Sequence, residues 1–306
     1  MAETGTSGAQ ELTRWQRMAL RRLVKAAGKR PGQALESSDW AAYFALTIDP
    51  TGRAWKWMLG RLPTSPRCGV CSAPFAGVGA RLVRPLGYRP SRKNPNICAT
   101  CVELAPPGGM TMQAGVLFAD IRGFTELSSN TSPAEVTRLL YRFYSCAEKV
   151  LFPAALIDKL IGDQVMALYL PLYRLPGGSD GPTGDVAKVM LVQARKLLAS
   201  IGYGTRQGPF IDVGVGLDFG EAFVGNIGEG AVRDFTAIGD VVNTAARLQA
   251  AAGTGEIVMS ARAAEELEEP VGERTDLAVK GKADPVSVYR IDAGRELQRS
   301  SARAVL

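Results

Sequence analysis

Strand-like apolar runs alternate with helix-like periodicity through the last two thirds of the chain. Residues 115–120 and 164–170 are short apolar runs rich in β-forming side chains, which is typical of buried strands. Residues 132–152 and 185–201 carry apolar side chains at helical spacing, and the first of these segments opens with a Ser cap, a Pro and a Glu. Because strands and helices alternate, the class is predicted to be α/β or α+β.

The same periodicities predict the remaining elements of this region. They are a hairpin, a helix, a strand, a short helix and two closing strands, at residues 211–217 with 221–224, 240–251, 256–260, 261–267, 276–279 and 286–291. Residues 106–109 (PPGG) are predicted to be the linker that enters this region.

The first third of the chain is predicted to be helical. Residues 11–27 place apolar side chains at helical spacing and arginines or lysines on the remaining surface. Such a basic amphipathic helix can bind an anionic membrane or RNA, but it is more often the solvated face of a packed helix. A second helix at residues 38–46, with Ser38 or Asp39 as its cap, and a short third at 55–59 are expected to pack with it.

Four cysteines form two pairs of the type CxxC. Cys68 and Cys71 make the first pair, and Cys98 and Cys101 the second, with 26 residues between them. Four thiolates satisfy tetrahedral Zn²⁺, and such a closed site is structural because no position remains for a substrate. A Cys₄ iron–sulfur centre fits the same ligands. The Gly-, Pro- and Arg-rich insert between the pairs is expected to form an extended loop or hairpin.

The amino-acid composition limits the kinds of reaction and ligand that the chain can support. The chain has 306 residues, 46% of them hydrophobic, and a net charge of +6. No apolar run approaches the ~18 residues that span a bilayer, and the N-terminus has no signal-peptide pattern, so a cytoplasmic protein without a transmembrane segment is expected. The positive charge suits a polyphosphate ligand, although many proteins without one share it. The sequence contains no histidine, which excludes His-based acid–base catalysis and His-ligated metals.

Two aspartates stand at the ends of predicted strands. Asp120 follows the first apolar run, and Asp163 follows Gly162 in a predicted tight turn between two strands. Carboxylates at the ends of neighbouring strands can share a pair of divalent cations, as in two-metal phosphoryl chemistry.

Four segments closely resemble the signature segments of the class III nucleotide cyclases, the adenylate and guanylate cyclase family. They are residues 118–128 (FADIRGFTELS), 159–163 (KLIGD), 234–248 (DFTAIGDVVNTAARL) and 279–282 (VKGK). The resemblance covers about residues 112–292. It implies an α+β fold with a ferredoxin-like βαββαβ core, and the N-terminal helical segment and the small Cys₄ module predicted above precede this core.

The resemblance also implies roles for individual residues in the phosphate and metal chemistry. Asp120, Asp163 and the backbone of Ile121 would hold two Mg²⁺ or Mn²⁺ ions. The backbone around Phe124 and Thr125 would cradle phosphate oxygens at the start of a helix.

The remaining motif positions would read the nucleotide. Lys159 and Thr236 would recognise adenine, because guanine presents the opposite donor and acceptor pattern on that edge. Asn243 would orient the ribose and Arg247 would stabilise charge at the α-phosphate. Lys280 would bind the terminal phosphate, with Lys282 the less favoured lysine.

Together these residues predict a homodimeric adenylate cyclase with two composite sites, acting on ATP. A guanylate cyclase is an alternative that Lys159 and Thr236 disfavour. A second alternative is a nucleic-acid-binding zinc ribbon with a non-catalytic nucleotide-sensing domain. Its support is the basic insert between the cysteine pairs, and sparse aromatic residues there make nucleic acid an unlikely partner.

The predicted division of the chain has four parts. Residues 1–62 are the helical region, 63–108 the metal-binding module and linker, 109–292 the catalytic domain and 293–306 the C-terminal tail. The N-terminal parts are expected to regulate or orient the catalytic dimer.

Overall fold

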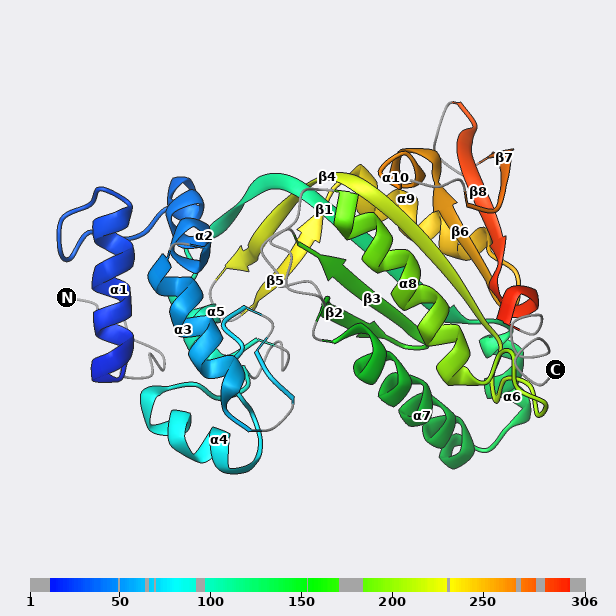
Figure 1. Ribbon diagram of the computed structural model, residues 1–306, viewed down its shortest axis with the longest axis horizontal. Helices are drawn as coiled ribbons and strands as arrows, with labels where there is room; N and C mark the ends of the chain where they lie inside the picture. The colour runs from blue at the N-terminus through cyan, green and yellow to red at the C-terminus, as the bar shows by residue number, and fades with distance from the viewer. Residues whose placement is uncertain are drawn as a thin grey trace, which may run out of the picture. The chain divides into compact units, whose positions relative to one another are not determined.

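The computed structural model describes residues 12–48, 50–63, 66–68, 70–91, 97–152, 154–170, 184–229, 232–267, 271–278 and 284–297. The chain forms two compact units (Figure 1). One consists of Met1–Gly109 together with Asn226–Asp234, and the other of Met110–Gly225 together with Phe235–Leu306.

The core of the second unit is a βαββαβ arrangement. Its strands and helices are, in order, β1 (Gly108–Ile121), α7 (Pro133–Leu151), β2 (Leu156–Ile161), β3 (Gln164–Tyr169), α8 (Gly184–Ile201) and β4 (Val213–Glu229), with the short α6 (Phe124–Asn130) after β1. These four strands lie side by side in the order β2-β3-β1-β4. The α+β class and the ferredoxin-like core are therefore confirmed.

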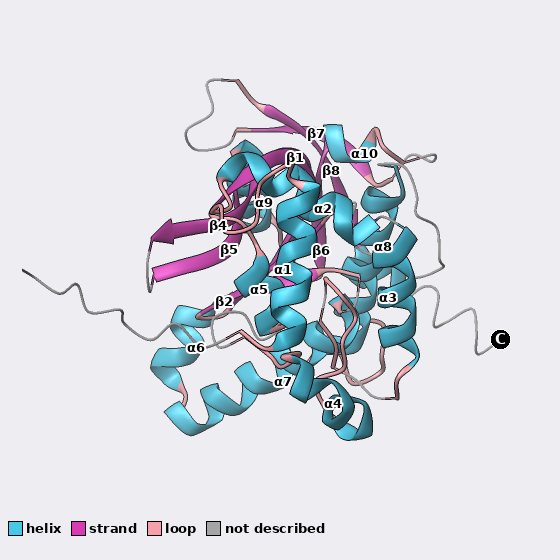
Figure 2. Ribbon diagram, turned by 90° about the vertical axis from the view of Figure 1, so that its left-hand side faces the viewer, coloured by secondary structure: helices cyan, strands magenta, loops and turns pink. Residues whose placement is uncertain are grey.

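The sheet continues beyond β4 with strands from the end of the chain. Across the described residues it has eight strands, in which β6 (Glu256–Ser260), β8 (Val286–Asp292) and β7 (Glu273–Leu277) follow β4, while β5 (Val232–Ile238) pairs with β4 separately. β6 runs parallel to β4, and β8 is antiparallel to both β6 and β7. The hairpin of β7 and β8 forms the far edge (Figure 2).

Helices cover both faces of this sheet. α7 and α8 lie side by side on one face (Figure 1), over a core that includes Leu117, Val165 and Ile257. Successive residues of a strand point to opposite faces. Val258 therefore belongs to a second, smaller cluster, with Leu248 of α9 (Asp240–Ala251).

A glycine sets the position of α9. A methyl group at Gly216 of β4 would lie 2.2 Å from the backbone nitrogen of Gln249 and 2.3 Å from the oxygen of Ala245. Only the missing side chain allows this close approach of helix to strand. The sheet therefore holds α9 at a defined depth, together with the functional residues predicted along it.

The N-terminal unit is mostly helical. Its elements are α1 (Arg14–Ala26), η1 (Ser37–Asp39), α2 (Trp40–Ile48), α3 (Pro50–Arg61), α4 (Gly77–Val83), η2 (Arg84–Leu86) and α5 (Ala99–Leu104). Trp40 is fully buried and donates from Nε1 to the oxygen of Pro107, 3.0 Å away. Trp15 and Trp55 both donate from Nε1 to the hydroxyl of Tyr88, at 2.9 and 3.0 Å.

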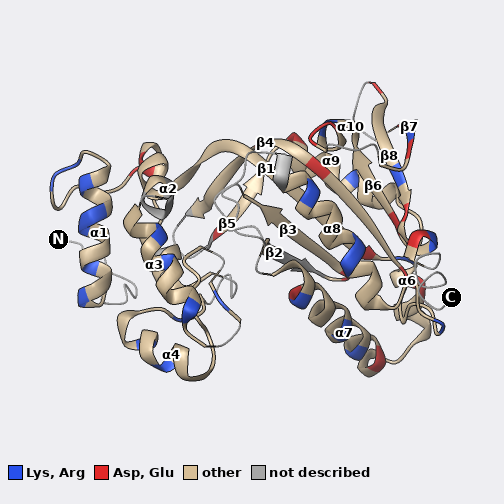
Figure 3. Cartoon of the chain, viewed as in Figure 1, with Lys and Arg blue, Asp and Glu red and all other residues tan. Residues whose placement is uncertain are grey.

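The basic helix at the N-terminus is α1, and its arginines are exposed on its surface (Figure 3). Leu23 is buried on its opposite side, and Val24 is buried as well. The prediction that this helix packs through its apolar side is confirmed. No helix in the described ranges is long and apolar enough to cross a bilayer.

The structure differs in detail from three sequence-based expectations. The predicted hairpin at residues 211–224 is instead the single strand β4, because its pairing with β1, β5 and β6 in the sheet overrides the local glycine signals. The predicted linker at 106–109 already contains the first residues of β1. The insert between the cysteine pairs was expected to be extended, but it folds into α4 and η2.

Candidate functional site

The two predicted metal carboxylates meet where β1 and β3 end. Asp120 is the register partner of Gln164, the residue after Asp163. The backbone nitrogen of Ile121 donates to the oxygen of Asp163 across 3.4 Å. Gly162, at φ +61°, forms the turn that brings Asp163 to this position, in the left-handed region that favours glycine.

One oxygen of Asp120 is held by two donors. Gln249 donates from Nε2 to Oδ2 at 3.1 Å, and Arg122 donates from Nη2 to the same atom at 3.3 Å. The other oxygen, Oδ1, is buried, and no N–H or O–H group in the described part of the chain donates to it. Burial and the adjacent Asp163 raise the pKa of Asp120 to about 6.

A divalent cation suits this pair of carboxylates. Two like charges in a partly buried site oppose each other's ionisation, and a cation between them removes that opposition. The free oxygen of Asp120 is of the hard type that Mg²⁺ and Mn²⁺ prefer. Asp120 and Asp163 therefore fit the predicted metal site.

The helix α9, whose Gln249 contacts Asp120, also carries the predicted catalytic residues Asn243 and Arg247. These two residues lie on other sides of the helix. Gln249 is buried against Asp120, whereas Asn243 is exposed and Arg247 half-buried. At 3.6 residues per turn, Arg247 points about 160° away from Gln249 around the helix axis. Asn243 points about 120° away from Gln249. α9 thus separates Arg247 and Asn243 from the carboxylates of their own chain.

The two predicted base-reading residues lie on different strands. Thr236 of β5 is 6% exposed, and its hydroxyl donates to Oδ2 of Asp158 at 2.7 Å. Lys159 of β2 is the register partner of Met166, and a β-bulge at Asp158 shifts the register between Ile157 and Lys159. The side chain of Lys159 lies outside the description.

The other predicted site residues are only partly placed. Phe124 and Thr125 begin α6, directly after Gly123 in the left-handed region at φ +67°. Phe124 packs against the main core, and Thr125 is exposed. Lys280 and Lys282 fall outside the described residues.

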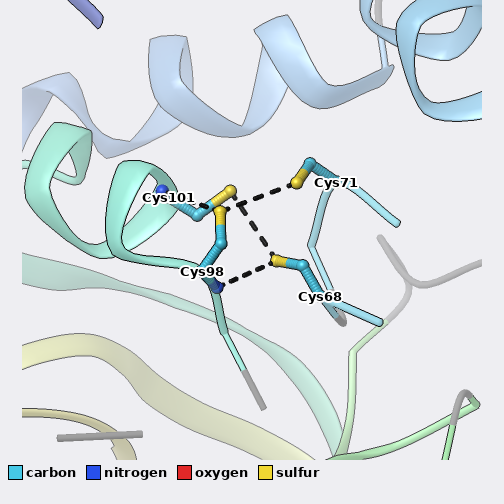
Figure 4. Close-up of side chains that lie close together, drawn as sticks. All are labelled: Cys68, Cys71, Cys98 and Cys101. Carbon is cyan, nitrogen blue, oxygen red and sulfur yellow. Dashed lines mark hydrogen bonds between the residues drawn. The ribbon is translucent and has the colours of Figure 1, made fainter. Parts of the chain in front are cut away.

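Cys68, Cys71, Cys98 and Cys101 come together in the N-terminal unit (Figure 4). All four sulfur atoms lie within 4.8 Å of one another. The Sγ atoms of Cys68 and Cys101 are 3.9 Å apart, and those of Cys71 and Cys98 are 3.7 Å apart. A tetrahedral Zn²⁺ with bonds of ~2.3 Å needs sulfur separations of ~3.8 Å.

Backbone groups support this arrangement of sulfurs. The nitrogen of Cys98 donates to the sulfur of Cys68 at 3.2 Å, and that of Cys101 to the sulfur of Cys98 at 3.3 Å. Burial raises the pKa of Cys98, and the neighbouring Cys68 raises that of Cys101. A bound cation would offset both effects, so the cluster fits a metal ion.

Sequence reasoning missed several residues of the site around Asp120 and Asp163. Arg122 and Gln249 hold Asp120, and Gln164 donates from Nε2 to Oε1 of Gln249 at 3.1 Å. The hydroxyl of Tyr144 donates to the oxygen of Gly162 in the turn before Asp163. Arg122 stands inside a recognised motif, but the partners of Gln249 are distant in the sequence, so no local pattern marks it.

Comparison with known proteins relates the second unit to a protein family. A model of the adenylate and guanylate cyclase catalytic domain matches residues 109–293. An adenylate cyclase from Anabaena cylindrica is 30% identical over 212 residues, which cover 62% of this chain and 40% of that protein. An uncharacterized protein of Mycobacterium tuberculosis is 28% identical over 235 residues, 76% of this chain and 39% of that protein. The chain thus spans about 40% of the length of these two relatives.

Solved structures with a similar fold include cyclases of both substrate types. The guanylyl cyclase Cya2 has a TM-score of 0.52 and 25% identity, and the match covers 60% of this chain and 93% of that one. The adenylyl cyclase CyaB from P. aeruginosa has a TM-score of 0.51 and 28% identity, with 60% and 94% covered.

Proposed function

Because the chain belongs to the adenylate and guanylate cyclase catalytic domain family, we propose that it is an adenylate cyclase. It converts ATP to 3′,5′-cyclic AMP and pyrophosphate. The resemblance seen in the four sequence motifs is confirmed by the family match over residues 109–293. The choice of ATP over GTP rests on Lys159 and Thr236.

The main support for the proposal is that Gln249 and Arg247 lie on different faces of α9. Gln249 faces Asp120 of its own chain, while Arg247 leaves the helix about 160° away from Gln249 around the axis. A second copy of the chain can supply Arg247 and Asn243 to this Asp120, and receive the reciprocal set. The enzyme is therefore a symmetric homodimer with two composite sites.

Asp120 and Asp163 hold the catalytic Mg²⁺ or Mn²⁺ ions, with the backbone of Ile121 nearby. When bound, these ions favour ionisation of the ribose 3′-hydroxyl and neutralise charge on the phosphates. Gln249 and Arg122 occupy Oδ2 of Asp120, which leaves Oδ1 for a ligand. The chain thus orients the carboxylate before the nucleotide arrives.

In the reaction the 3′-oxygen forms a bond to the α-phosphorus and the bond from that phosphorus to the β-phosphate oxygen breaks. Pyrophosphate leaves and the 3′-hydroxyl proton is lost. Asn243 orients the ribose, and Arg247 stabilises the charge that grows on the α-phosphate, a role typically worth ~10²–10³ in turnover. Backbone groups around Phe124 and Thr125 bind phosphate oxygens, and Lys280 binds the terminal phosphate.

Adenine is selected by a donor and an acceptor. Lys159 donates to ring nitrogen N1, and the hydroxyl of Thr236 accepts from the exocyclic amine. Guanine presents a donor and an acceptor in the reverse positions, so it meets two mismatched contacts.

The N-terminal unit regulates or orients the dimer. Its four cysteines hold a structural Zn²⁺, for which their sulfur separations are suited. We assign residues 1–62 to the helical region, 63–108 to the metal module, 109–292 to the catalytic domain and 293–306 to the tail.

The test is cyclic nucleotide production by the purified chain, with ATP or GTP and with Mg²⁺ or Mn²⁺. We expect cyclic AMP from ATP, and none from an Asp120→Asn variant. Predominant cyclic GMP would replace the assignment with a guanylate cyclase. An absence of product from both nucleotides would overturn the enzymatic assignment.

A further inference from the structure

A buried hydroxyl and a buried carboxylate meet where the base is read. The hydroxyl of Thr236 on β5 donates to Oδ2 of Asp158 on β2 at 2.7 Å, across 78 positions of sequence. The two residues are 6% and 8% exposed. This distance is typical of a hydroxyl that donates to an oxygen atom.

The backbone of β2 is shaped to present Asp158. The register of β2 on β3 pairs Ile157 with Ala167 and Lys159 with Met166, so Asp158 is the extra residue of a β-bulge. Bulges re-aim side chains and are common beside functional sites. Here the bulge places a carboxylate directly before the predicted base-reading lysine.

A hydroxyl group carries one proton and two lone pairs. A threonine whose hydroxyl rotates freely can donate to guanine O6 as readily as it accepts from the adenine amine. Thr236 alone therefore cannot discriminate between the two bases. Once its proton is committed to a carboxylate, which has none to return, the hydroxyl can only accept from a ligand.

We propose that Asp158 is a specificity-determining positioning residue, which makes Thr236 an obligate hydrogen-bond acceptor and so selects adenine over guanine. Asp158 does not touch the base in this scheme and acts through Thr236. The inference rests on the proposed function, because it takes Thr236 as the residue that meets position 6 of the purine.

The principal test is the variant Asp158→Asn, measured alone and combined with Thr236→Val. The amide of asparagine can donate to Thr236, which frees the hydroxyl proton to point at the base. An unpaired or mismatched buried polar group costs about 1–3 kcal/mol, so the ratio of kcat/KM for ATP to that for GTP should fall roughly 5- to 160-fold. With Thr236→Val in place, Asp158→Asn should leave the ratio unchanged.

A matched control uses the same substitution in another hydroxyl–carboxylate pair. Ser287 donates to Oδ1 of Asp276 at 2.5 Å, between β8 and β7 at the far edge of the sheet. Asp276→Asn should not change the ratio. An equal fall in ATP and GTP turnover for Asp158→Asn, or an equal change of ratio with and without Thr236→Val, would overturn the proposal.

A second measurement avoids any change at Asp158, in case that variant does not fold. The values of kcat/KM for inosine triphosphate and purine riboside triphosphate are measured with the native chain and with Thr236→Val. Inosine carries an oxygen at position 6, and purine riboside carries a hydrogen there. The two nucleotides also differ at ring nitrogen N1. That difference affects the ratio of their kcat/KM values equally in both proteins, so it cancels when the two ratios are compared. The ratio of kcat/KM for inosine triphosphate to that for purine riboside triphosphate should be higher for Thr236→Val than for the native chain. If it is lower, Thr236 donates to O6 and the proposal fails.

Failure of the proposed function is separable from failure of this inference. A native chain that makes only cyclic GMP, or no cyclic product, contradicts the adenylate cyclase assignment. For a chain without turnover, the same variants are read through ATP and GTP affinity, measured as protection against thermal unfolding. A native preference for ATP that Asp158→Asn does not reduce would reject the role of Asp158 by itself.

Discussion

Gln249 donates from Nε2 to Oδ2 of Asp120 at 3.1 Å, and so connects α9 to the end of β1. The contact turns one side of α9 toward the carboxylates of its own chain. Asn243 and Arg247 point to other sides of the helix, about 120° and 160° away from Gln249.

Mixing two inactive variants should restore activity. Asp120→Asn removes the carboxylate of one half-site and Arg247→Ala the guanidinium of the other. In a mixed dimer one composite site is intact, so an equal mixture should recover about a quarter of native activity after subunit exchange. The measurement is cyclic AMP formation before and after mixing. Each variant alone should stay inactive, and a mixture that also stays inactive would contradict the composite site.

Replacing Gln249 by methionine should weaken metal binding. The change keeps the volume of a buried side chain but removes the donor to Asp120. Loss of an outer partner of a metal ligand typically costs about 10- to 100-fold in metal affinity. We expect a rise of that size in the Mn²⁺ concentration for half-maximal activity.

Gln193→Met is the matched control for this effect. Gln193 is also a buried glutamine, and its Oε1 accepts from the hydroxyl of Tyr169 at 2.7 Å within the core. It should lower stability without changing the dependence on Mn²⁺. Equal Mn²⁺ dependence in the two variants would show that Gln249 acts through packing alone.

Metal binding should release a proton at mildly acidic pH. Burial and Asp163 raise the pKa of Asp120 from 3.8 to about 6, so near pH 5 the folded chain keeps a proton that the unfolded chain has lost. The stability of the metal-free protein should therefore fall as pH rises between these two values. Divalent metal displaces the proton, so its affinity should rise with pH through about 6.

Calorimetry in buffers of different ionisation enthalpy measures this proton. We expect release approaching one proton per chain near pH 5 and little release at pH 8, with the acidic signal lost in Asp120→Asn. Equal release at both pH values would assign the proton to another group.

The cysteine cluster should hold one zinc ion per chain and stabilise the N-terminal unit. Cys98→Ser removes one of four ligands, so zinc content should fall and this unit should unfold more easily. All four tryptophans lie between residues 15 and 57, so their fluorescence reports this unit. Cys146→Ser, in α7, is the control and should leave the zinc content unchanged. Iron in place of zinc in the purified protein would identify an iron–sulfur centre.

Local signals predicted the elements whose causes are local. α9 begins at Asp240 and ends at Ala251, as its helical periodicity predicted. α7 begins after Ser132, whose hydroxyl accepts from the backbone nitrogen of Glu135 at 3.3 Å. β1 ends beside Asp120, as the apolar run before it predicted. In each case a few adjacent residues carry the cause, so the sequence alone shows it.

Elements that depend on distant partners were not predictable in this way. β4 is one strand of 17 residues rather than a hairpin, because it pairs with β1, β5 and β6 in the sheet. The insert that forms α4 reads as extended in isolation, and Ala80 and Val83 become helical with their side chains buried in the unit. Pairing and burial therefore overrode the local glycine and proline signals.

By itself, the sequence determined the family motifs, the strand that carries Asp120, the turn before Asp163 and the four cysteines of the metal module. Only the tertiary structure decided that Gln249 holds Asp120 and that Asp158 takes the proton of Thr236. These pairs lie 129 and 78 positions apart along the chain. Their contacts exist only because sheet pairing and the close approach of α9 at Gly216 bring distant segments together, which no local pattern of residues encodes.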